Sequence, residues 1–218
     1  MKFMVSKKEI VEIAHRVYRN GFVAAYDGNI SAATKSGTFY ITRSAVNKGD
    51  VTEDDILEIS SEGKVVSGQG KPSTENKLHL FIYKNRPDVK AVVHCHPIFA
   101  TAFAAAGIAI DKPVLPEVIL TLGKIPLCNY ATPSTDELHL SLKPYIKNSS
   151  LFLLSNHGAV AAGKNLKDAY YKMEKLEHTA KTLFLAKQLG GERLISEEKL
   201  KELYSIAEST YGIKISED

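Results

Sequence analysis

An apolar run that ends in the triplet His94-Cys95-His96 constrains the fold of this chain more than any other feature. If residues 91–96 form a strand, both imidazoles point to one side of it and Cys95 points to the other. Two imidazoles on one face can bind a single transition-metal ion, because ring nitrogens are common ligands of such ions. The pattern alone leaves a chance His-x-His pair, or a buried and hydrogen-bonded histidine, as the alternative.

A third histidine, His157, follows a second apolar run at residues 151–154 and precedes Gly158. A glycine beside a strand end lets a ligand approach the backbone closely. Three histidine ligands would leave one coordination position open, which is typical of catalytic rather than structural zinc. We therefore consider His94, His96 and His157 together as candidate metal ligands.

Composition is that of an ordinary globular protein. The chain has 218 residues, of which 44% are apolar and 24% charged, and a formal net charge of +3. We expect one domain over residues 1–218, long enough to bury a sizeable core. No long basic run is present, so the sequence gives no support to nucleic-acid binding.

The sequence also argues against membrane insertion. The first nine residues are charged and lack an apolar signal core, and no run approaches 18 apolar residues. Cys95 and Cys128 lie in apolar surroundings, and we interpret them as reduced core residues. These features favour a cytoplasmic location without membrane partners.

Hydrophobic periodicity predicts helices and strands that alternate along the chain. The predicted helices cover 6–20, a segment capped by Ser73 or Thr74 and ending before Pro87, 97–103, a long segment from 165 to 190, and 196–212. The predicted strands cover 39–42, 56–59, 64–66, 90–94, 151–155 and 159–162. Residues 27–31 are predicted to be a polar turn, 108–135 a mixture of short strands and loops, and 192–218 a C-terminal helical segment. Such alternation predicts a layered α/β domain.

Five short motifs occur in an order that resembles one known family, the class II (zinc-dependent) aldolase/adducin-head family, and most of all its L-fuculose-1-phosphate aldolase branch. The motifs are Gly28-Asn29-Ile30-Ser31, Pro72-Ser73-Thr74-Glu75, His94-Cys95-His96, Tyr130-Ala131-Thr132 and Asn156-His157-Gly158. The resemblance extends from about residue 6 to residue 190. It implies a single three-layer α/β/α domain around a central mixed, largely antiparallel sheet.

The resemblance also implies the chemistry. His94, His96 and His157 match the family's zinc ligands, so we expect one divalent metal per subunit, with Zn²⁺ first and Co²⁺, Mn²⁺ or Fe²⁺ as alternatives. Glu75 matches the family's general acid/base. From the sequence alone, a first-turn helix glutamate stabilised by the helix dipole is the better explanation of Glu75, and the resemblance reverses that preference.

Four further positions match the family's phosphate-binding residues: Asn29, Ser44, Ser73 and Thr74. Short hydroxyl and amide donors at turns and helix starts suit a phosphate dianion. One departure concerns Ala45, because the family commonly has glycine after the residue that matches Ser44. Alanine accepts fewer backbone conformations than glycine, so this loop is a place where the phosphate site could be altered.

Three residues are weaker candidates. Glu117 stands about where the fuculose-phosphate enzymes have a tyrosine, and it is either a contact from a neighbouring subunit or a loop carboxylate. Tyr211 could reach an active site as a C-terminal tyrosine does in relatives. His79 follows Glu75 by four residues on the same helical face, so it either supports the site or is an ordinary packed histidine.

The resemblance favours an aldolase that reversibly cleaves a ketose 1-phosphate into dihydroxyacetone phosphate and an aldehyde through a metal-stabilised enediolate. A methylthioribulose-1-phosphate dehydratase is the first alternative. A pentulose-phosphate 4-epimerase and a non-enzymatic adducin-like module are less favoured. The expected partners are a phosphorylated ketose, an aldehyde and further copies of the chain in a homotetramer.

Overall fold

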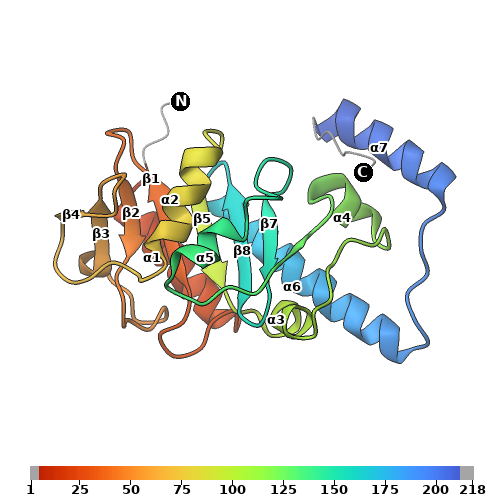
Figure 1. Cartoon of the computed structure of the whole chain (residues 1–218), viewed down its shortest axis with the longest axis horizontal. Coiled ribbons are helices and arrows are strands. Elements are labelled where there is room, and N and C mark those ends of the chain that lie inside the picture. Colours follow the sequence, from red (N-terminus) through yellow and green to blue (C-terminus); the bar gives the residue numbers. More distant parts are fainter. Residues whose placement is uncertain (1–4, 212–218) are drawn as a thin grey trace.

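The computed structural model describes residues 5–211, with the side chain of Tyr211 outside that description. One eight-stranded sheet, in the order β4-β3-β2-β1-β5-β8-β7-β6, forms its centre (Figure 1). Every neighbouring pair is antiparallel except β6 and β7, which are parallel. The strands are β1 (Asn29–Ala33), β2 (Phe39–Thr42), β3 (Ile56–Ile59), β4 (Val65–Ser67), β5 (Ala91–Cys95), β6 (Leu127–Cys128), β7 (Leu151–Leu154) and β8 (Gly158–Gly163).

Helices cover both faces of this sheet and make three layers. One core cluster joins α1, α3 and α6 to one face, and a second cluster joins α2 and α5 to the other. The helices are α1 (Lys7–Arg19), α2 (Asn76–Asn85), α3 (Ile98–Ala105), α4 (Pro116–Thr121), α5 (Asp136–Leu140), α6 (Leu166–Gln188) and α7 (Glu197–Tyr211), with a short 3-10 helix, η1 (Glu53–Asp55). The α/β/α architecture with a mixed, largely antiparallel sheet is therefore confirmed.

The prediction of a polar turn at residues 27–31 is wrong from Asn29 onward, because Asn29–Ala33 is strand β1. Ile30 and Ala32 are buried in the α1/α6 core, as alternate residues of a strand should be. The strand pairs on both sides, with β2 and with β5. Its polar residues face the opposite layer, where buried hydrogen bonds satisfy them.

Two other boundaries differ from the prediction. Helix α2 begins at Asn76, and Glu75 rather than Ser73 or Thr74 occupies the N-cap position. The segment 108–135, where short strands and loops were expected, also contains the short helix α4, and a second short helix, α5, begins directly after it. Pro116 starts α4, in keeping with the preference of proline for the first helical turn.

The C-terminal helix α7 packs on α4, and Figure 1 shows the two side by side at the right of the molecule. We expected the apolar segment 113–119 to be exposed on a lone subunit, and the structure contradicts this. Val114 and Val118 pack against the core and Ile119 is buried, so within that stretch only Pro116 and Glu117 are exposed. Among the described residues, no helix is both long and apolar enough to cross a membrane.

Candidate active site

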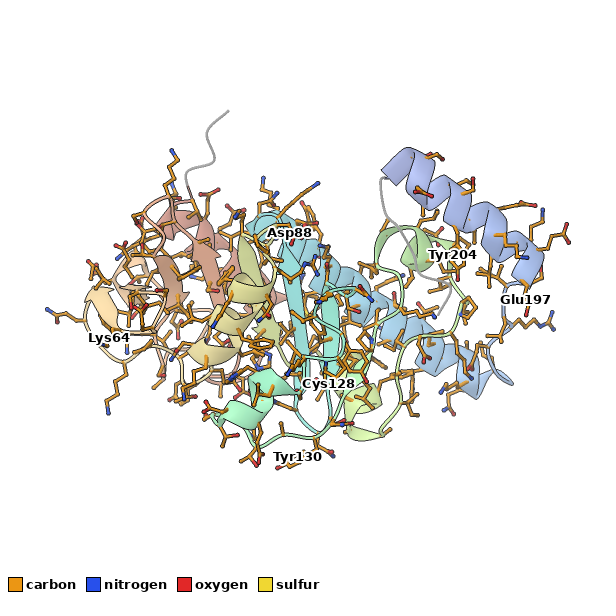
Figure 2. The ribbon with its side chains drawn as sticks, turned by 45° about the horizontal axis from the view of Figure 1, so that its top comes forward. Lys64, Asp88, Cys128, Tyr130, Glu197 and Tyr204 are labelled. Carbon is orange, nitrogen blue, oxygen red and sulfur yellow. The ribbon has the colours of Figure 1, made fainter. Side chains whose placement is uncertain are left out.

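The candidate site lies at one end of the sheet, and the strand register explains how it is assembled. Asn29 at the start of β1 pairs with His94 near the end of β5. The last residue of β5, Cys95, pairs with Ala159 at the start of β8, which follows His157 directly. Figure 2 shows Tyr130 beyond β6 at this end of the sheet and Asp88, which precedes β5, at the other. Three distant segments of sequence therefore meet here.

His94, His96 and His157 form the group that could hold a metal ion, with ligand atoms all within 4.8 Å of one another. The alternation predicted for β5 is confirmed, because Cys95 lies in the α1/α6 core while His94 faces the α2 side. His94 Nδ1 donates to the carbonyl oxygen of Ala159 at 2.9 Å, which turns Nε2 toward the other two rings. Backbone hydrogen bonding of this kind fixes the orientation of metal-ligating histidines.

The donor set fits a divalent cation. His94 Nε2 and His96 Nε2 lie 3.2 Å apart, so these electron-rich atoms need a proton or a cation between them. Burial, reinforced by His94 and His157, lowers the pKa of His96 to about 3, which favours the neutral, ligating form. Three neutral imidazoles leave the full charge of an ion available to a substrate.

The turn that carries His157 has an unusual backbone. Asn156 has φ +56°, in the left-handed region, which asparagine tolerates better than most residues. Gly158 follows, where a Cβ would lie 2.5 Å from His96 Cδ2 and 2.6 Å from the Cys95 carbonyl oxygen. Glycine is therefore required there for the His157 turn to approach His96 closely.

Glu75 reaches the same point from the start of α2. Its carboxylate oxygens lie 3.1 Å from His94 Nε2 and 3.2 Å from His157 Nε2. Burial raises the pKa of the Glu75 carboxyl, but the adjacent His94 and His157 rings lower it more, so the net pKa lies well below its usual value. Asn29 Nδ2 also donates to Glu75 at 2.8 Å. The structure therefore brings an ionised carboxylate and the three imidazoles together.

The four residues matched to phosphate binding border this group on one side. Ser44 donates to the carbonyl oxygen of Pro72 at 2.8 Å, and this contact ties the loop after β2 to the segment before Glu75. Ser73 is buried and its hydroxyl accepts from the Glu75 backbone N–H at 3.3 Å, while Thr74 is exposed. Asn29 uses one amide N–H on Glu75, which leaves its second N–H for a ligand.

Ala45 adopts φ +57°, a left-handed conformation that costs a non-glycine residue about 1–3 kcal/mol. The loop thus keeps a backbone shape that glycine would adopt without strain. Ala45, which stands where the family commonly has glycine, therefore does not impose the right-handed or extended backbone that alanine usually adopts.

Lys48, which in the sequence could be either a charge partner for phosphate or a solvated lysine, is buried in the structure. Its side chain is 1% exposed, and its ammonium group donates to the carbonyl oxygens of Tyr26 (3.2 Å) and Val46 (2.9 Å). Burial lowers the pKa of Lys48 to about 8, and Cys95 and Asp27 oppose that shift. Lys48 therefore links the loop before β1 to the loop after β2, near the candidate ligand His96.

Two carboxylates that no sequence motif indicates lie close to His96 and to the helix that follows it. Asp27 Oδ2 lies 3.6 Å from His96 Nδ1, a distance that suits electrostatic orientation better than a direct hydrogen bond. Glu177 on α6 accepts from the backbone N–H groups of Phe99 and Ala100 at 2.9 and 2.8 Å. It thereby caps α3, the helix that starts two residues after His96, from an element more than 70 residues away.

The weaker candidates have different outcomes. His79 is fully buried and lies within hydrogen-bond distance of Asn29, which in turn contacts Glu75. Glu117 is exposed on α4, and it is not among the residues that contact the three histidines in this chain. Tyr211 is the last residue of α7, and its side chain lies outside the described part of the chain.

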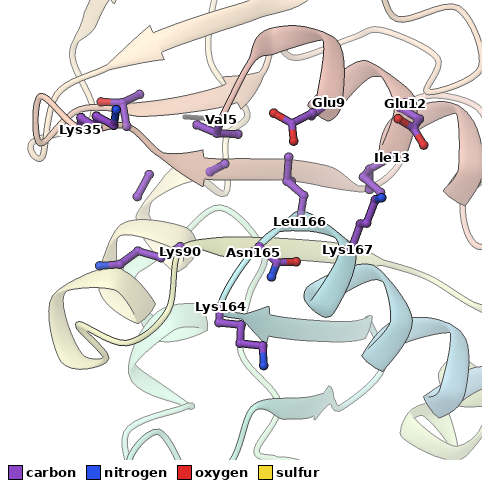
Figure 3. A pocket seen from close by; sticks show the side chains of 13 residues that line it. Val5, Glu9, Glu12, Ile13, Lys35, Lys90, Lys164, Asn165, Leu166 and Lys167 are labelled. Atoms are coloured by element: carbon purple, nitrogen blue, oxygen red, sulfur yellow. The ribbon is translucent and has the colours of Figure 1, made fainter. Parts of the chain in front are cut away.

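A separate cavity of about 450 Å³ opens at the opposite end of the sheet (Figure 3). Its floor is apolar, with Ile13 and Leu166, and the lysines 35, 90, 164 and 167 stand around it. None of the three histidines lines this cavity. We therefore do not assign the chemistry to it.

The chain resembles known proteins of one family. Residues 8–184 match the family model described as Class II Aldolase and Adducin N-terminal domain. A 3-oxo-tetronate 4-phosphate decarboxylase of Pectobacterium atrosepticum is 34% identical over 184 residues, 83% of this chain and 84% of that protein. An L-fuculose phosphate aldolase of Methanocaldococcus jannaschii is 33% identical over 181 residues, 83% of this chain and 97% of that protein.

A solved structure shares the whole architecture. The crystal structure of YgbL from Klebsiella pneumoniae, titled a putative aldolase/epimerase/decarboxylase, superposes with a TM-score of 0.84 at 28% identity. The superposition covers 90% of this chain and 96% of that one. The match therefore includes the sheet and both helical layers.

Proposed function

Because the chain belongs to the class II aldolase and adducin N-terminal domain family, we propose that it is a metal-dependent aldolase. It would reversibly cleave a ketose 1-phosphate to dihydroxyacetone phosphate and an aldehyde. The observation that carries this proposal is the position of the Glu75 carboxylate, 3.1–3.2 Å from the Nε2 atoms of His94 and His157. The Glu75 carboxylate is thereby held beside the three histidines. A substrate carbonyl that binds an ion held by those histidines would lie next to this base.

His94, His96 and His157 would hold the ion, one per subunit, and zinc suits three imidazoles with an open position. Cobalt, manganese and iron also accept imidazole ligands. When bound, the ion supplies Lewis-acid polarisation of the substrate carbonyl. Both the fixed His94 orientation and the neutral state of His96 favour ligation.

Glu75 performs the proton transfer. When the C3–C4 bond of the ketose phosphate breaks, its electron pair stays on C3 and an aldehyde departs with C4. As that bond breaks, the C4 hydroxyl gives up its proton and its O–H electron pair forms the aldehyde carbonyl. Ionised Glu75 takes up the released proton and passes it to C3 to form dihydroxyacetone phosphate, and in the direction of synthesis it removes the proton from C3. Its lowered pKa keeps the carboxylate ionised at neutral pH, which makes it competent as the base.

The substrate phosphate would bind beside Glu75, at Asn29, Ser44, Ser73 and Thr74. Asn29 has a free amide N–H, and Ser44 and Ser73 bring hydroxyls and nearby backbone to the same side. Short donors at a helix start suit a dianion. These contacts would orient the ketose so that its carbonyl meets the metal group.

A second candidate function is decarboxylation, which the 34% identity to a 3-oxo-tetronate 4-phosphate decarboxylase favours. In that substrate the bond between the carboxylate and C2 breaks, and the electron pair remains on a carbon next to a ketone. Protonation of that carbon again gives dihydroxyacetone phosphate. The two reactions therefore share their intermediate and differ only in the fragment that leaves.

One assay separates the two functions. The metal-loaded enzyme is given ketose 1-phosphates or 3-oxo-tetronate 4-phosphate, and dihydroxyacetone phosphate is followed by coupled reduction with NADH. Aldehyde from ketose phosphates supports the aldolase, whereas carbon dioxide from the oxo acid alone supports the decarboxylase. Exchange of the C3 proton of dihydroxyacetone phosphate in deuterated water tests the shared intermediate. Absence of both exchange and products would overturn both functions.

The other family activities give distinct outcomes. A methylthioribulose-1-phosphate dehydratase would lose only water, and a pentulose-phosphate 4-epimerase would return an isomer of the same mass. An adducin-like module would bind no metal and catalyse none of these reactions. The three histidines argue against the last of these, because a non-enzymatic module does not need an ion-binding group.

A further inference from the structure

A chain of hydrogen bonds leads from Glu75 into the interior between β1 and α2. Asn29 Nδ2 donates to Glu75 Oε2 at 2.8 Å, and Asn29 Oδ1 lies 2.5 Å from His79 Nε2. His79 Nδ1 lies 2.6 Å from the Ser31 hydroxyl, which lies 2.7 Å from the hydroxyl of Tyr83. All five residues are buried.

The direction of every bond follows from the carboxylate. Ionised Glu75 can only accept, so Asn29 must present its N–H₂ group to Glu75 and its oxygen to His79. His79 Nε2 must therefore carry the proton, and Nδ1 must be the acceptor. Ser31 then donates to His79 and accepts from Tyr83. The donors all point toward Glu75, and such one-directional chains polarise and strengthen one another.

His79 cannot reach the substrate, because no part of it is exposed. Burial, reinforced by the nearby His94 ring, lowers the pKa of His79 to about 3, so the ring is neutral at physiological pH. A neutral ring with Ser31 on one nitrogen and Asn29 on the other has a single consistent tautomer, with hydrogen on Nε2. The ring therefore acts as a rigid donor rather than as a proton carrier.

We infer that His79 is a positioning residue, which holds the Asn29 amide with its N–H toward Glu75 and so fixes the carboxylate for proton transfer. Without the Nε2–H donor, the amide is free to rotate by half a turn and present its oxygen to Glu75. Two oxygens would then face each other, and the carboxylate would move. This inference rests on the proposed role of Glu75.

Two amide substitutions separate positioning from mere packing. In His79→Gln the side-chain amide reaches the place of Nε2 and can still donate to Asn29. In His79→Asn the shorter amide reaches only the place of Nδ1, so the contact with Ser31 survives and the donor to Asn29 is lost. His15→Gln, at a histidine on α1 that hydrogen-bonds to Val51 at 2.9 Å, is a matched remote control.

The expected result is a fall in kcat of about 10–100-fold for His79→Asn, as for other residues that orient active-site groups. Metal content by mass spectrometry should change less than about twofold. His79→Gln should recover most of kcat, together with any rise in KM, because the second Asn29 N–H is placed at the substrate phosphate. The His15→Gln control should match wild type. Equal losses in the Gln and Asn variants, or wild-type kcat in His79→Asn, would overturn the inference.

A measurement independent of activity distinguishes the inference from the proposed function. Long-range ¹H–¹⁵N NMR of the metal-loaded enzyme reports which nitrogen of His79 carries hydrogen. An Nε2–H signal that persists at pH 5.5 is expected, and an Nδ1–H tautomer would overturn the inference. If wild type failed to exchange the C3 proton of dihydroxyacetone phosphate, the proposed function would fall while the tautomer result would stand.

Discussion

Gly158→Ala is the substitution whose effect on the metal group can be worked most directly from the structure. Gly158 follows His157 and begins β8. A Cβ at this position would lie 2.5 Å from His96 Cδ2 and 2.6 Å from the carbonyl oxygen of Cys95. Its φ is not in the left-handed region, so alanine acts there through contact rather than backbone strain.

The magnitude follows from the size of the overlap. Non-bonded carbons are in optimal contact at about 3.5–4.0 Å, so the His96 ring must move by about 1 Å. Metal–ligand distances tolerate only about 0.2 Å. The displacement therefore removes His96 from good coordination, and we expect metal affinity to fall at least about 10–100-fold. That loss corresponds to about 1.4–2.8 kcal/mol of binding free energy.

The control is Gly163→Ala, at the other end of the same strand. There the Cβ would lie 2.8 Å from Cα of Ala169, so the overlap is with helix α6 rather than with a ligand. We expect this variant to lose unfolding free energy while its folded fraction binds metal normally. Chelator competition gives the dissociation constant, and urea unfolding gives the stability. Wild-type metal affinity in folded Gly158→Ala would refute the reasoning.

Three further predictions follow from the site and its surroundings. Glu75→Gln keeps the shape but not the base, so turnover and C3-proton exchange should fall about 10²–10⁴-fold with metal retained; undiminished exchange would rule Glu75 out. Burial lowers the pKa of Lys48 from 10.5 to about 8. Between these pH values the unfolded chain binds more protons than the folded chain, so the free energy of unfolding rises with pH, by about 3 kcal/mol in total. Urea unfolding at pH 7, 8.5 and 10 should show this rise in wild type and not in Lys48→Met, and an equal rise in both would exclude Lys48 as its source. We also expect the homotetramer that the family resemblance implies, with Ile98 and Tyr130, 70% and 64% exposed, available for subunit contact; a fully active monomer in light scattering at micromolar concentration would contradict this.

Strand alternation was enough to predict much of the metal group. An apolar run followed by His94-Cys95-His96 specifies which side chains share a face, and the structure places Cys95 in one core and His94 against Glu75. The meeting with His157 could not come from alternation, because it depends on the pairing of β5 with β8. Only the resemblance to the class II aldolase family, carried by the order of the five motifs, predicted that His157 joins His94 and His96.

The sequence predicted a polar turn where strand β1 lies, and the cause is the burial of the two polar side chains of that strand. Asn29 and Ser31 made the segment look like a polar turn, yet alternate residues Ile30 and Ala32 face the core. The two polar side chains are buried because His79 on α2 supplies their hydrogen-bond partner. Polarity in a sequence therefore indicates exposure only where no distant element satisfies the polar groups.

Lys48 illustrates the same limit for a charge. A lone lysine is normally solvated, and nothing near it in sequence predicts otherwise. The carbonyl oxygens of Tyr26 and Val46 accept its protons in the folded chain, and the first of these belongs to a loop more than 20 residues away. The burial of such a group depends on tertiary structure, which local patterns do not contain.

The two candidate reactions use the histidines and Glu75 in the same way. They differ in the fragment that leaves, which other residues must contact. Both pass through the same anion of dihydroxyacetone phosphate, so substitutions at Glu75 or His79 should slow aldol cleavage and decarboxylation by similar factors. Selectivity must instead come from groups that meet the departing aldehyde or carboxylate. Tyr130, exposed at this end of the sheet, is a candidate for such a contact. Tyr130→Ala should therefore change the ratio of kcat/KM between the two substrate classes while leaving C3-proton exchange intact, and a parallel loss of exchange would show that Tyr130 acts on the shared step.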